Sequence, residues 1–361
     1  MQKKRHLARK IIILVICFIL VLAIAGLWGL SVVIYNDNFD KRFESYEPQM
    51  YYVEDFENLE RTKYEFSSDK GQMLTGYMYS SGDNQKGVVV LAHGFGGGGH
   101  NSYMDVANFF AQNNYFVFAY DATGNDESEG ESVGGLPQGV IDLEHAISFV
   151  KQQDDYNSLP IVLFGHSWGG YSASSVLTYH PDVKAVIECA GFNRSSDVIE
   201  STGKEIVGNS VHLMMPFVKI HERINYGKYA TNTALDGFEA SDAAVLVLHS
   251  EDDSTVPVEY GYDIYYDKYK DDPRFKFIHF DDRGHSYVYH DVTYINDFNA
   301  EFDKWLETLD YDYNAEENKE HFIADKADYI NKNLDREKWS NMLDSELFKQ
   351  FLNFYDKNIE N

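Results

Sequence analysis

The chain has 361 residues, of which 44% are hydrophobic, 15% aromatic and 25% charged, so neither a disordered nor a fibrous class is indicated. Its formal net charge is −27 at pH 7. A nucleic-acid partner is not expected, because phosphate binding depends on clustered lysine and arginine. The excess of carboxylates predicts a solvated, self-repelling surface instead.

The N-terminal region has the pattern of a membrane anchor. Residues 1–10 hold five basic residues and no acid, and residues 11–30 follow without a charge. A membrane span needs about 20 apolar residues. We therefore predict a cytoplasmic basic segment (1–10) and a single transmembrane helix (11–35). Positive charge before the span favours a cell-membrane protein whose N-terminus is cytoplasmic and whose folded domain lies outside.

Two other interpretations of this region remain open. A cleaved signal peptide is one, since Ala23 to Ala25 could be a processing site. Cleavage there would leave the apolar run GLWGLSVVIY at the new terminus, which favours an uncleaved anchor. A domain that faces the cytosol is the other. Only two cysteines, Cys17 and Cys189, are present, so we expect no disulfide in the outer domain, as fits a bacterial exported protein.

Short β-type segments alternate with longer helix-type segments after a polar, tyrosine-rich stalk expected at 36–61. Several of the β-type segments are continuous apolar runs, which is typical of strands covered on both faces. We predict a domain at 62–310 with a mostly parallel eight-stranded sheet and helices on both of its faces. The strands are expected at 62–67, 73–80, 87–92, 115–120, 160–164, 184–189, 243–249 and 275–280, and the helices at 102–113, 136–153, 168–180, 258–269 and 291–309.

Two segments depart from this alternation. Residues 192–242 are too long for a plain loop between strands and contain the apolar run VHLMMPFVKI. We predict a small helical cap whose apolar underside faces the functional site; a packed satellite cluster is the alternative. Residues 311–361 form an acidic, helical C-terminal extension. Its last helix, at 344–355, spaces leucine and aromatic side chains for docking onto the domain.

The segment GHSWG at 165–169 matches the pattern G-x-S-x-G between a strand-like and a helix-like run. Such a turn holds the serine exposed above the strand end, and the glycines on both sides leave out side chains for which there is no room. The N–H groups at the start of the following helix favour a developing negative charge. We therefore predict Ser167 as a nucleophile.

A serine hydroxyl needs a base, and the base needs an acid behind it. After this type of turn the acid precedes the histidine along the chain. His285, which follows the last predicted strand, is the predicted base; His290 is the alternative, and His279 lies inside the strand and is expected to pack. Asp253 is the predicted acid and Asp252 the alternative. Both follow a buried strand, at the edge where ligands of open α/β sheets bind.

The run HGFGGGG at 93–99 closes another apolar strand and lacks the Lys-Ser/Thr pair of a phosphate-binding P-loop. We predict that it forms half of an oxyanion hole, in which the N–H of Phe95 pairs with that of Trp168. His93 is expected to brace the loop by hydrogen bonding. The segment YDATGNDESEG at 120–130 is expected to be a solvated turn. Since no cysteine or histidine cluster has metal-ligand spacing, neither a metal nor a cofactor is expected.

Taken in order, the motifs HGFGGG, YDATGNDESEG, GHSWGG, HSEDDSTVP and DRGHSY resemble the α/β-hydrolase superfamily. Within it the chain is similar to serine-aminopeptidase-like and monoacylglycerol-lipase-like hydrolases, including membrane-anchored bacterial members. The resemblance covers residues 62–309 and implies the α/β-hydrolase fold. It also implies the site residues: Ser167, Asp253 and His285 as nucleophile, acid and base, Phe95 and Trp168 as the oxyanion hole, and 192–242 as the cap.

The activity that this resemblance implies is that of a serine hydrolase. A carboxylesterase or lipase-like enzyme is expected before an aminopeptidase or amidase with the same three residues. A non-catalytic, surface-anchored binding protein is the third alternative. The expected partners are a small acyl ester or short peptide as substrate and the membrane through residues 11–35; the oligomeric state is left open.

Overall fold

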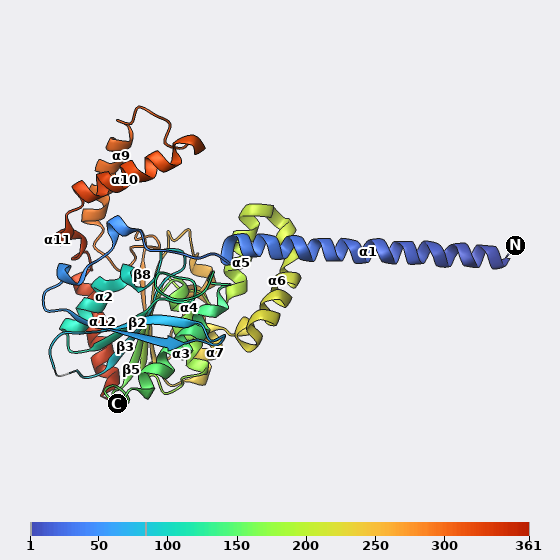
Figure 1. The fold of residues 1–361 in the computed structure, drawn as a ribbon. Helices are drawn as coiled ribbons and strands as arrows, with labels where there is room; N and C mark the ends of the chain where they lie inside the picture. The colour runs from blue at the N-terminus through green and yellow to red at the C-terminus, as the bar shows by residue number, and fades with distance from the viewer. Residues whose placement is uncertain (1, 84, 361) are drawn as a thin grey trace.

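The computed structural model describes residues 2–83 and 85–360; Met1 and Asn361, at the ends of the expected basic segment and C-terminal extension, lie outside the described residues. An eight-stranded sheet with the strand order β1-β2-β4-β3-β5-β6-β7-β8 forms the centre of the molecule (Figure 1). The strand β2 is antiparallel to both of its neighbours, and the six strands from β4 to β8 run parallel. The strands are β1 (Glu60–Ser67), β2 (Met73–Ser80), β3 (Val88–Ala92), β4 (Phe116–Tyr120), β5 (Ile161–His166), β6 (Ala185–Cys189), β7 (Ala244–Ser250) and β8 (Phe275–Phe280). The predicted fold class is confirmed, and each predicted strand lies within two residues of an observed one.

The central strands are apolar throughout because both of their faces are covered. In β3, Val88, Val90 and Ala92 contribute to one hydrophobic core, and Val89 and Leu91 contribute to the other. Successive side chains of a strand point to opposite faces, so a strand between two cores cannot alternate with polar residues. The same requirement explains the unbroken apolar runs seen in the sequence.

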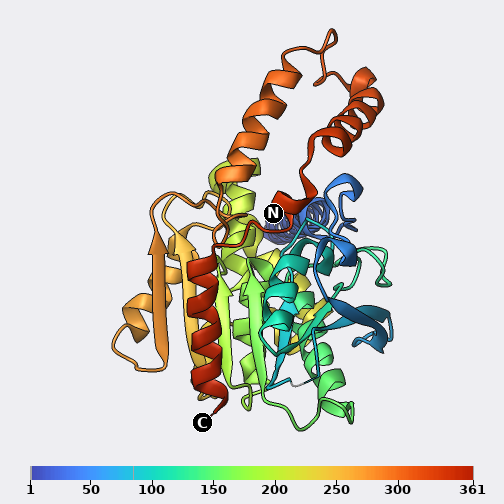
Figure 2. The same ribbon diagram turned by 90° about the vertical axis from the view of Figure 1, so that its left-hand side faces the viewer.

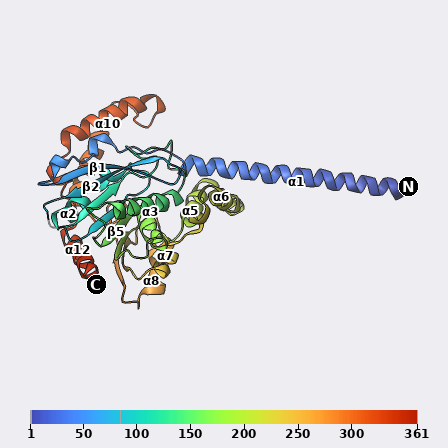
Figure 3. The ribbon, with the colours of Figure 1, turned by 60° about the horizontal axis from the view of Figure 1, so that its bottom comes forward.

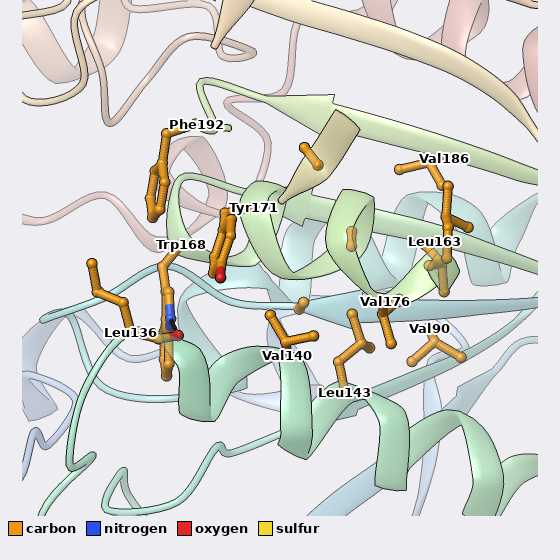
Figure 4. Close-up of a cluster of buried hydrophobic side chains, with 14 of the residues drawn as sticks. Val90, Leu136, Val140, Leu143, Leu163, Trp168, Tyr171, Val176, Val186 and Phe192 are labelled. Carbon is orange, nitrogen blue, oxygen red and sulfur yellow. Dashed lines mark hydrogen bonds between the residues drawn. The ribbon is translucent and has the colours of Figure 1, made fainter. Parts of the chain in front are cut away.

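Helices cover both faces of the sheet (Figures 2 and 3). One face carries α3 (Pro137–Gln152), α4 (Trp168–Ser175), α7 (Ala234–Ala240) and α8 (Tyr262–Tyr269), and the other carries α2 (Met104–Gln112) and α12 (Ser345–Ile359). Figure 4 shows Val140 and Leu143 of α3 on the side that faces α4, with Leu163 of β5 near Val176. The helices at 168–180 and 258–269 are shorter than predicted, because 3₁₀ turns occupy residues 176–178 and 258–260.

The C-terminal extension projects and then returns. The helices α9 (Thr293–Leu306) and α10 (Lys319–Asn333) extend from the body, and α11 (Arg336–Trp339) leads back to it (Figure 2). Neither α10 nor α11 was predicted. The docking of the last helix is confirmed, since the apolar side of α12 is buried and Tyr355 donates a hydrogen bond of 2.6 Å to the carbonyl of Leu163 in the sheet.

Residues 36–61 do not stand free as a stalk. The helix α1 (Gln2–Phe39) continues past the expected end of the span, and the following segment, residues 40–59, lies on the body; we call it the strap. Its aromatic side chains find partners there. The ring of Phe43 lies 4.9 Å from that of Phe95, and Tyr51 and Phe56 are buried. Apart from the exposed Tyr52, the aromatic residues of the strap therefore pack against the body.

The predicted cap is helical, but its apolar side does not face the predicted site. The helices α5 (Ser195–Val207) and α6 (Val211–Tyr226) form a hairpin beside α1 (Figures 1 and 3). Phe217 stacks on Trp28 with ring centroids 6.3 Å apart, and Met214 and Val218 face α1 across a narrow crevice. The expectation fails because the C-terminal part of α1, residues 28–39, offers this hairpin an apolar partner of its own. The third helix of the segment, α7, packs on α4.

Glu222 gives this contact between α6 and α1 a pH dependence. Its carboxylate is buried and accepts hydrogen bonds from the hydroxyls of Tyr35 and Ser195 at 3.2 and 3.3 Å. Burial raises the pKa of Glu222 to about 7, and these hydrogen bonds only partly oppose the rise. The folded chain therefore holds a proton that the unfolded chain loses at about pH 4.5, so stability falls as the pH rises from about 4.5 to 7.

We expect the variant Glu222→Gln to be more stable than the wild type at pH 8, by on the order of 3 kcal/mol at most, because the amide needs no ionisation inside the protein. The difference should vanish below about pH 4.5, where both side chains are neutral. Unfolding of the detergent-solubilised chain at several pH values measures it. Glu205→Gln, at an exposed position of α5, is the control and should change little. Lower stability of Glu222→Gln at every pH would contradict the prediction.

Candidate active site

The strand β5 runs directly into α4 at Ser167. The backbone of Ser167 has φ +57° and ψ −118°, a conformation that a residue with a side chain adopts only when its surroundings impose it. A Cβ on Gly165 would lie 2.1 Å from the carbonyl oxygen of Gly169, and a Cβ on Gly169 would lie 2.0 Å from that of Ala92. Both glycines are therefore required by the turn, as the sequence pattern predicts.

The structure brings three of the predicted site residues into contact. His285 Nε2 lies 2.8 Å from Ser167 Oγ, and His285 Nδ1 lies 2.7 Å from Asp253 Oδ2. The serine follows β5, the aspartate follows β7 and the histidine follows β8. Because these strands are parallel, their carboxyl ends meet at one edge of the sheet, where the three loops converge.

Asp253 is held as a carboxylate that faces His285. Its other oxygen, Oδ1, accepts the N–H groups of Thr255 and Val256 at 2.9 and 2.8 Å, and His249 Nε2 lies 3.2 Å from Oδ2. Burial alone would raise the pKa of Asp253, but the hydrogen bonds from His249 and His285 outweigh burial and hold the pKa well below its usual range. The carboxylate is thus ionised at neutral pH, and it keeps a proton on Nδ1 of His285.

The other residues considered for the acid and the base have different partners. Asp252 is exposed and accepts hydrogen bonds from its own loop and from the loop after β8, so it shapes this turn. His290 is buried, with Nε2 3.0 Å from Asp105 Oδ2. His279 lies on the edge strand β8, where its ring packs 5.0 Å from that of Tyr262 and its Nε2 lies 3.2 Å from Glu251, so it packs at the surface of the sheet.

Buried side chains brace the glycine loop at 93–99. The predicted role of His93 is confirmed, since its Nε2 accepts the N–H of Ala122 at 3.0 Å and its Nδ1 donates to a carbonyl within the loop at 2.8 Å. Asp126 accepts an N–H at the far end of the same loop at 2.7 Å. Ala122 and Asp126 belong to 120–130, for which we predicted a solvated turn. That prediction is wrong, because the first half of this segment is buried against the glycine loop.

Phe95 and Trp168, the predicted oxyanion donors, are adjacent in space. The N–H of Gly94 is donated to Tyr103 Oη at 2.8 Å. The next N–H along the loop is that of Phe95, the predicted donor. Trp168 is the first residue of α4. Its indole donates to the carbonyl of Leu136 at 2.7 Å and meets the ring of Phe95 edge-on at 5.6 Å. These contacts hold the loop and the helix N-terminus in a fixed relation.

A chain of hydrogen bonds that the sequence did not suggest connects the two loops. His166 Nδ1 lies 2.9 Å from Tyr103 Oη, and His166 Nε2 lies 3.0 Å from the carbonyl oxygen of His285. Burial lowers the pKa of His166 to about 3, so the ring is neutral and carries one N–H. A carbonyl only accepts, so Nε2 donates to it and Nδ1 accepts the Tyr103 hydroxyl. The only sequence signal was that His166 adjoins Ser167.

A cavity of about 390 Å³ opens beside Ser167. Loops at the strand ends line one part of it, and the strap and the C-terminal extension line the rest. Of the described residues that line the cavity, none comes from 192–242. The sequence analysis expected the cap to line the cavity and missed the strap and the C-terminal extension, which line it instead.

The glycine loop and the Ser167 turn fall within residues 83–228, which match the family model described as serine aminopeptidase, S33. The Escherichia coli protein YfhR is 30% identical over 118 residues, which are 31% of this chain and 40% of that protein. The chain thus spans less than half of that relative. A monoacylglycerol lipase from Mycolicibacterium smegmatis is 25% identical over 231 residues, which are 55% of this chain and 81% of the lipase.

Among solved structures, an esterase from Pyrococcus furiosus matches with a TM-score of 0.52 and 16% identity, over 74% of this chain and 96% of the esterase. At this identity the likeness concerns the fold alone. The sheet order, the strand-to-helix turn at Ser167 and the family model agree with the motifs and their order along the chain. The chain has the α/β-hydrolase fold, and its residues 83–228 are similar to the serine aminopeptidase S33 family.

Proposed function

We propose that this protein is a membrane-anchored serine hydrolase that cleaves carboxylic esters through an acyl-enzyme on Ser167. The observation that carries the proposal is the unbroken contact from Ser167 Oγ through His285 to Asp253, at 2.8 and 2.7 Å. A lone serine hydroxyl is a weak nucleophile, and this arrangement is the one that activates it.

The proposed ester hydrolysis uses these contacts in the following steps. His285 takes the proton as Ser167 Oγ attacks the ester carbonyl, and Asp253 stabilises the imidazolium that forms. The N–H groups of Phe95 and Trp168 receive the oxyanion of the tetrahedral intermediate. The imidazolium then protonates the leaving alcohol. Water, deprotonated by His285, attacks the acyl-enzyme, and the acid leaves as Ser167 regains its proton.

Peptide hydrolysis is the second candidate, because the matched family model is described as a serine aminopeptidase. An aminopeptidase has to accommodate the charged amine of its substrate, and a buried ammonium group is costly without a partner carboxylate. Among the described residues that line the cavity, none is an aspartate or a glutamate. This lining supports an uncharged ester substrate. The assembled serine, histidine and aspartate argue against a protein that only binds.

The test uses the full-length chain in detergent. It compares p-nitrophenyl esters with aminoacyl p-nitroanilides and adds a fluorophosphonate probe that labels activated serines. We expect ester hydrolysis and labelling, with far slower turnover of the anilides. Preferential turnover of the anilides would favour the aminopeptidase, and a lack of reaction with every serine-directed probe would favour the non-catalytic alternative.

We further propose that α1 anchors the protein with its N-terminus in the cytoplasm and its hydrolase domain outside. Among the described residues, α1 is the one helix long and apolar enough to cross a membrane. The hairpin beside α1 supports a position of the domain close to a membrane surface. Leu213, Ile220 and Ile224 lie on one face of α6 and are 66%, 46% and 68% exposed, an apolar surface that suits the boundary of a bilayer.

This topology predicts that the full-length chain stays in the membrane fraction after alkaline carbonate extraction of expressing cells. Protease added to intact cells should digest the hydrolase domain. Release of a shortened domain by carbonate would indicate a cleaved signal peptide. Protection of the domain from external protease would indicate that it faces the cytosol.

A further inference from the structure

The cavity beside Ser167 is lined in part by residues that lie outside the matched family region. The strap passes the cavity near the N-terminal end of the hydrolase body, and the extension reaches it from the other end of the chain. Together they contribute Tyr46, Met50, Tyr51, Trp339 and Met342 to its lining. Neither segment belongs to residues 83–228, the part of the chain that matches the family model.

The strap and the extension are fastened to each other. The rings of Tyr51 and Trp339 stack with centroids 6.0 Å apart and planes 29° apart, and the Tyr51 hydroxyl donates to the Trp339 carbonyl at 3.2 Å. The Trp339 indole donates to the carbonyl of Gln49 at 3.1 Å. Arg336 donates to the carbonyl of Met50 at 2.6 Å. Two chain segments almost 290 residues apart thus form one wall.

The same wall is fixed to the glycine loop. Asn101 accepts the N–H of Tyr51 and donates to its carbonyl, both at 2.9 Å. The N–H and the hydroxyl of Ser45 both donate to Asp126, at 2.6 Å each, and Asp126 also holds the glycine loop. A wall tied at both ends is already formed before a substrate enters. Such a wall discriminates by shape, because little ordering remains to offset a poor fit.

The chemistry of the lining favours apolar groups. Among the described residues that line the cavity, none is a lysine, arginine, aspartate or glutamate, and the wall contributes three aromatic side chains and two thioethers beside the uncharged Ser45 and Gln49. The volume of about 390 Å³ lies near the lower end of the 300–1,000 Å³ typical of ligand pockets. At about 30 Å³ for each water-sized group, this leaves room for on the order of ten non-hydrogen atoms of substrate.

We propose that the wall formed by the strap and the C-terminal extension selects the substrate and admits uncharged esters whose acyl or alcohol group is short or of medium length. This inference rests on the proposed ester hydrolysis. Met50 and Met342 are the specificity-determining residues that can be changed without breaking the hydrogen bonds between the two segments. A long chain meets the wall and is excluded by it.

The test measures kcat/KM of the full-length chain for p-nitrophenyl esters with 2 to 16 acyl carbons and for acetate esters of alcohols of graded length. Met342→Ala, which enlarges the cavity, should raise the ratio of long to short substrates about tenfold in one of the two series. Met50→Trp, which fills it, should lower the ratio by a similar factor. Met73, exposed on β2 and outside the lining, supplies the matched controls Met73→Ala and Met73→Trp.

The outcomes separate the two proposals. Hydrolysis of the shortest ester should be unchanged in the two Met73 controls, and in the Met342 and Met50 variants it provides the reference against which longer esters are compared. Unchanged length profiles for both Met342→Ala and Met50→Trp, with this basal hydrolysis retained, would overturn the role of the wall and leave ester hydrolysis intact. If Met342→Ala does not fold, the half-buried Met50 position still decides the question. Absence of ester hydrolysis and fluorophosphonate labelling in the wild type would overturn both.

Discussion

Replacement of Ser167 by alanine is expected to abolish ester hydrolysis, with a fall in kcat of about 10⁴- to 10⁶-fold, while the chain stays folded. The reason is that Ser167 Oγ is the atom in contact with His285 Nε2, at 2.8 Å. Alanine keeps the Cβ and the backbone of the turn and removes only this oxygen. Turnover of p-nitrophenyl acetate and labelling by a fluorophosphonate measure the loss.

Ser158→Ala, at an exposed position in the loop before β5, is the matched control and should keep its activity within about threefold. Circular dichroism and thermal unfolding of both variants report whether the fold is retained. If Ser167→Ala still turned over esters at a rate near that of the wild type and still reacted with the probe, a different nucleophile would have to be sought.

The pair of variants Asp253→Asn and Asp252→Asn is expected to give the second largest contrast. An asparagine at 253 keeps the shape of the side chain but cannot stabilise the imidazolium, and it favours the wrong tautomer of His285, so kcat should fall about 10⁴-fold. Asp252 is one residue away and exposed, with no contact to the imidazole. Its change to asparagine should cost less than tenfold. Steady-state kinetics at pH 8 measure both.

These two variants also decide between residues that the sequence left as alternatives. Both aspartates follow the same strand, and both have hydrogen-bond partners in the loops at its end. Equal losses in the two variants would mean that the whole loop, rather than one carboxylate, supports the histidine. A larger loss for Asp252→Asn would reverse the assignment.

Local pattern was enough for much of this protein. The strands β3 to β7 follow from largely apolar runs of five to seven residues bounded by turns, and the turn at Ser167 follows from two glycines whose missing side chains have a steric reason. The order of the motifs along the chain after the nucleophile then suggested which loops carry the acid and the base. The inferences about the strands and the turn depend on neighbours within a few positions of the chain, which is the range over which sequence reports structure directly.

Tertiary contacts decided the rest. The apolar run in α6 was expected to be buried, but the sequence could not say against what, and the aromatic residues of the strap were assigned to a polar stalk although they pack on the body. Burial of an apolar surface is not directional, so α6 could equally have covered the site or packed on α1. The link from Tyr103 through His166 to His285, and the wall where Tyr51 meets Trp339, join residues between 63 and 288 positions apart. Such contacts exist only once the sheet has brought its distant segments together.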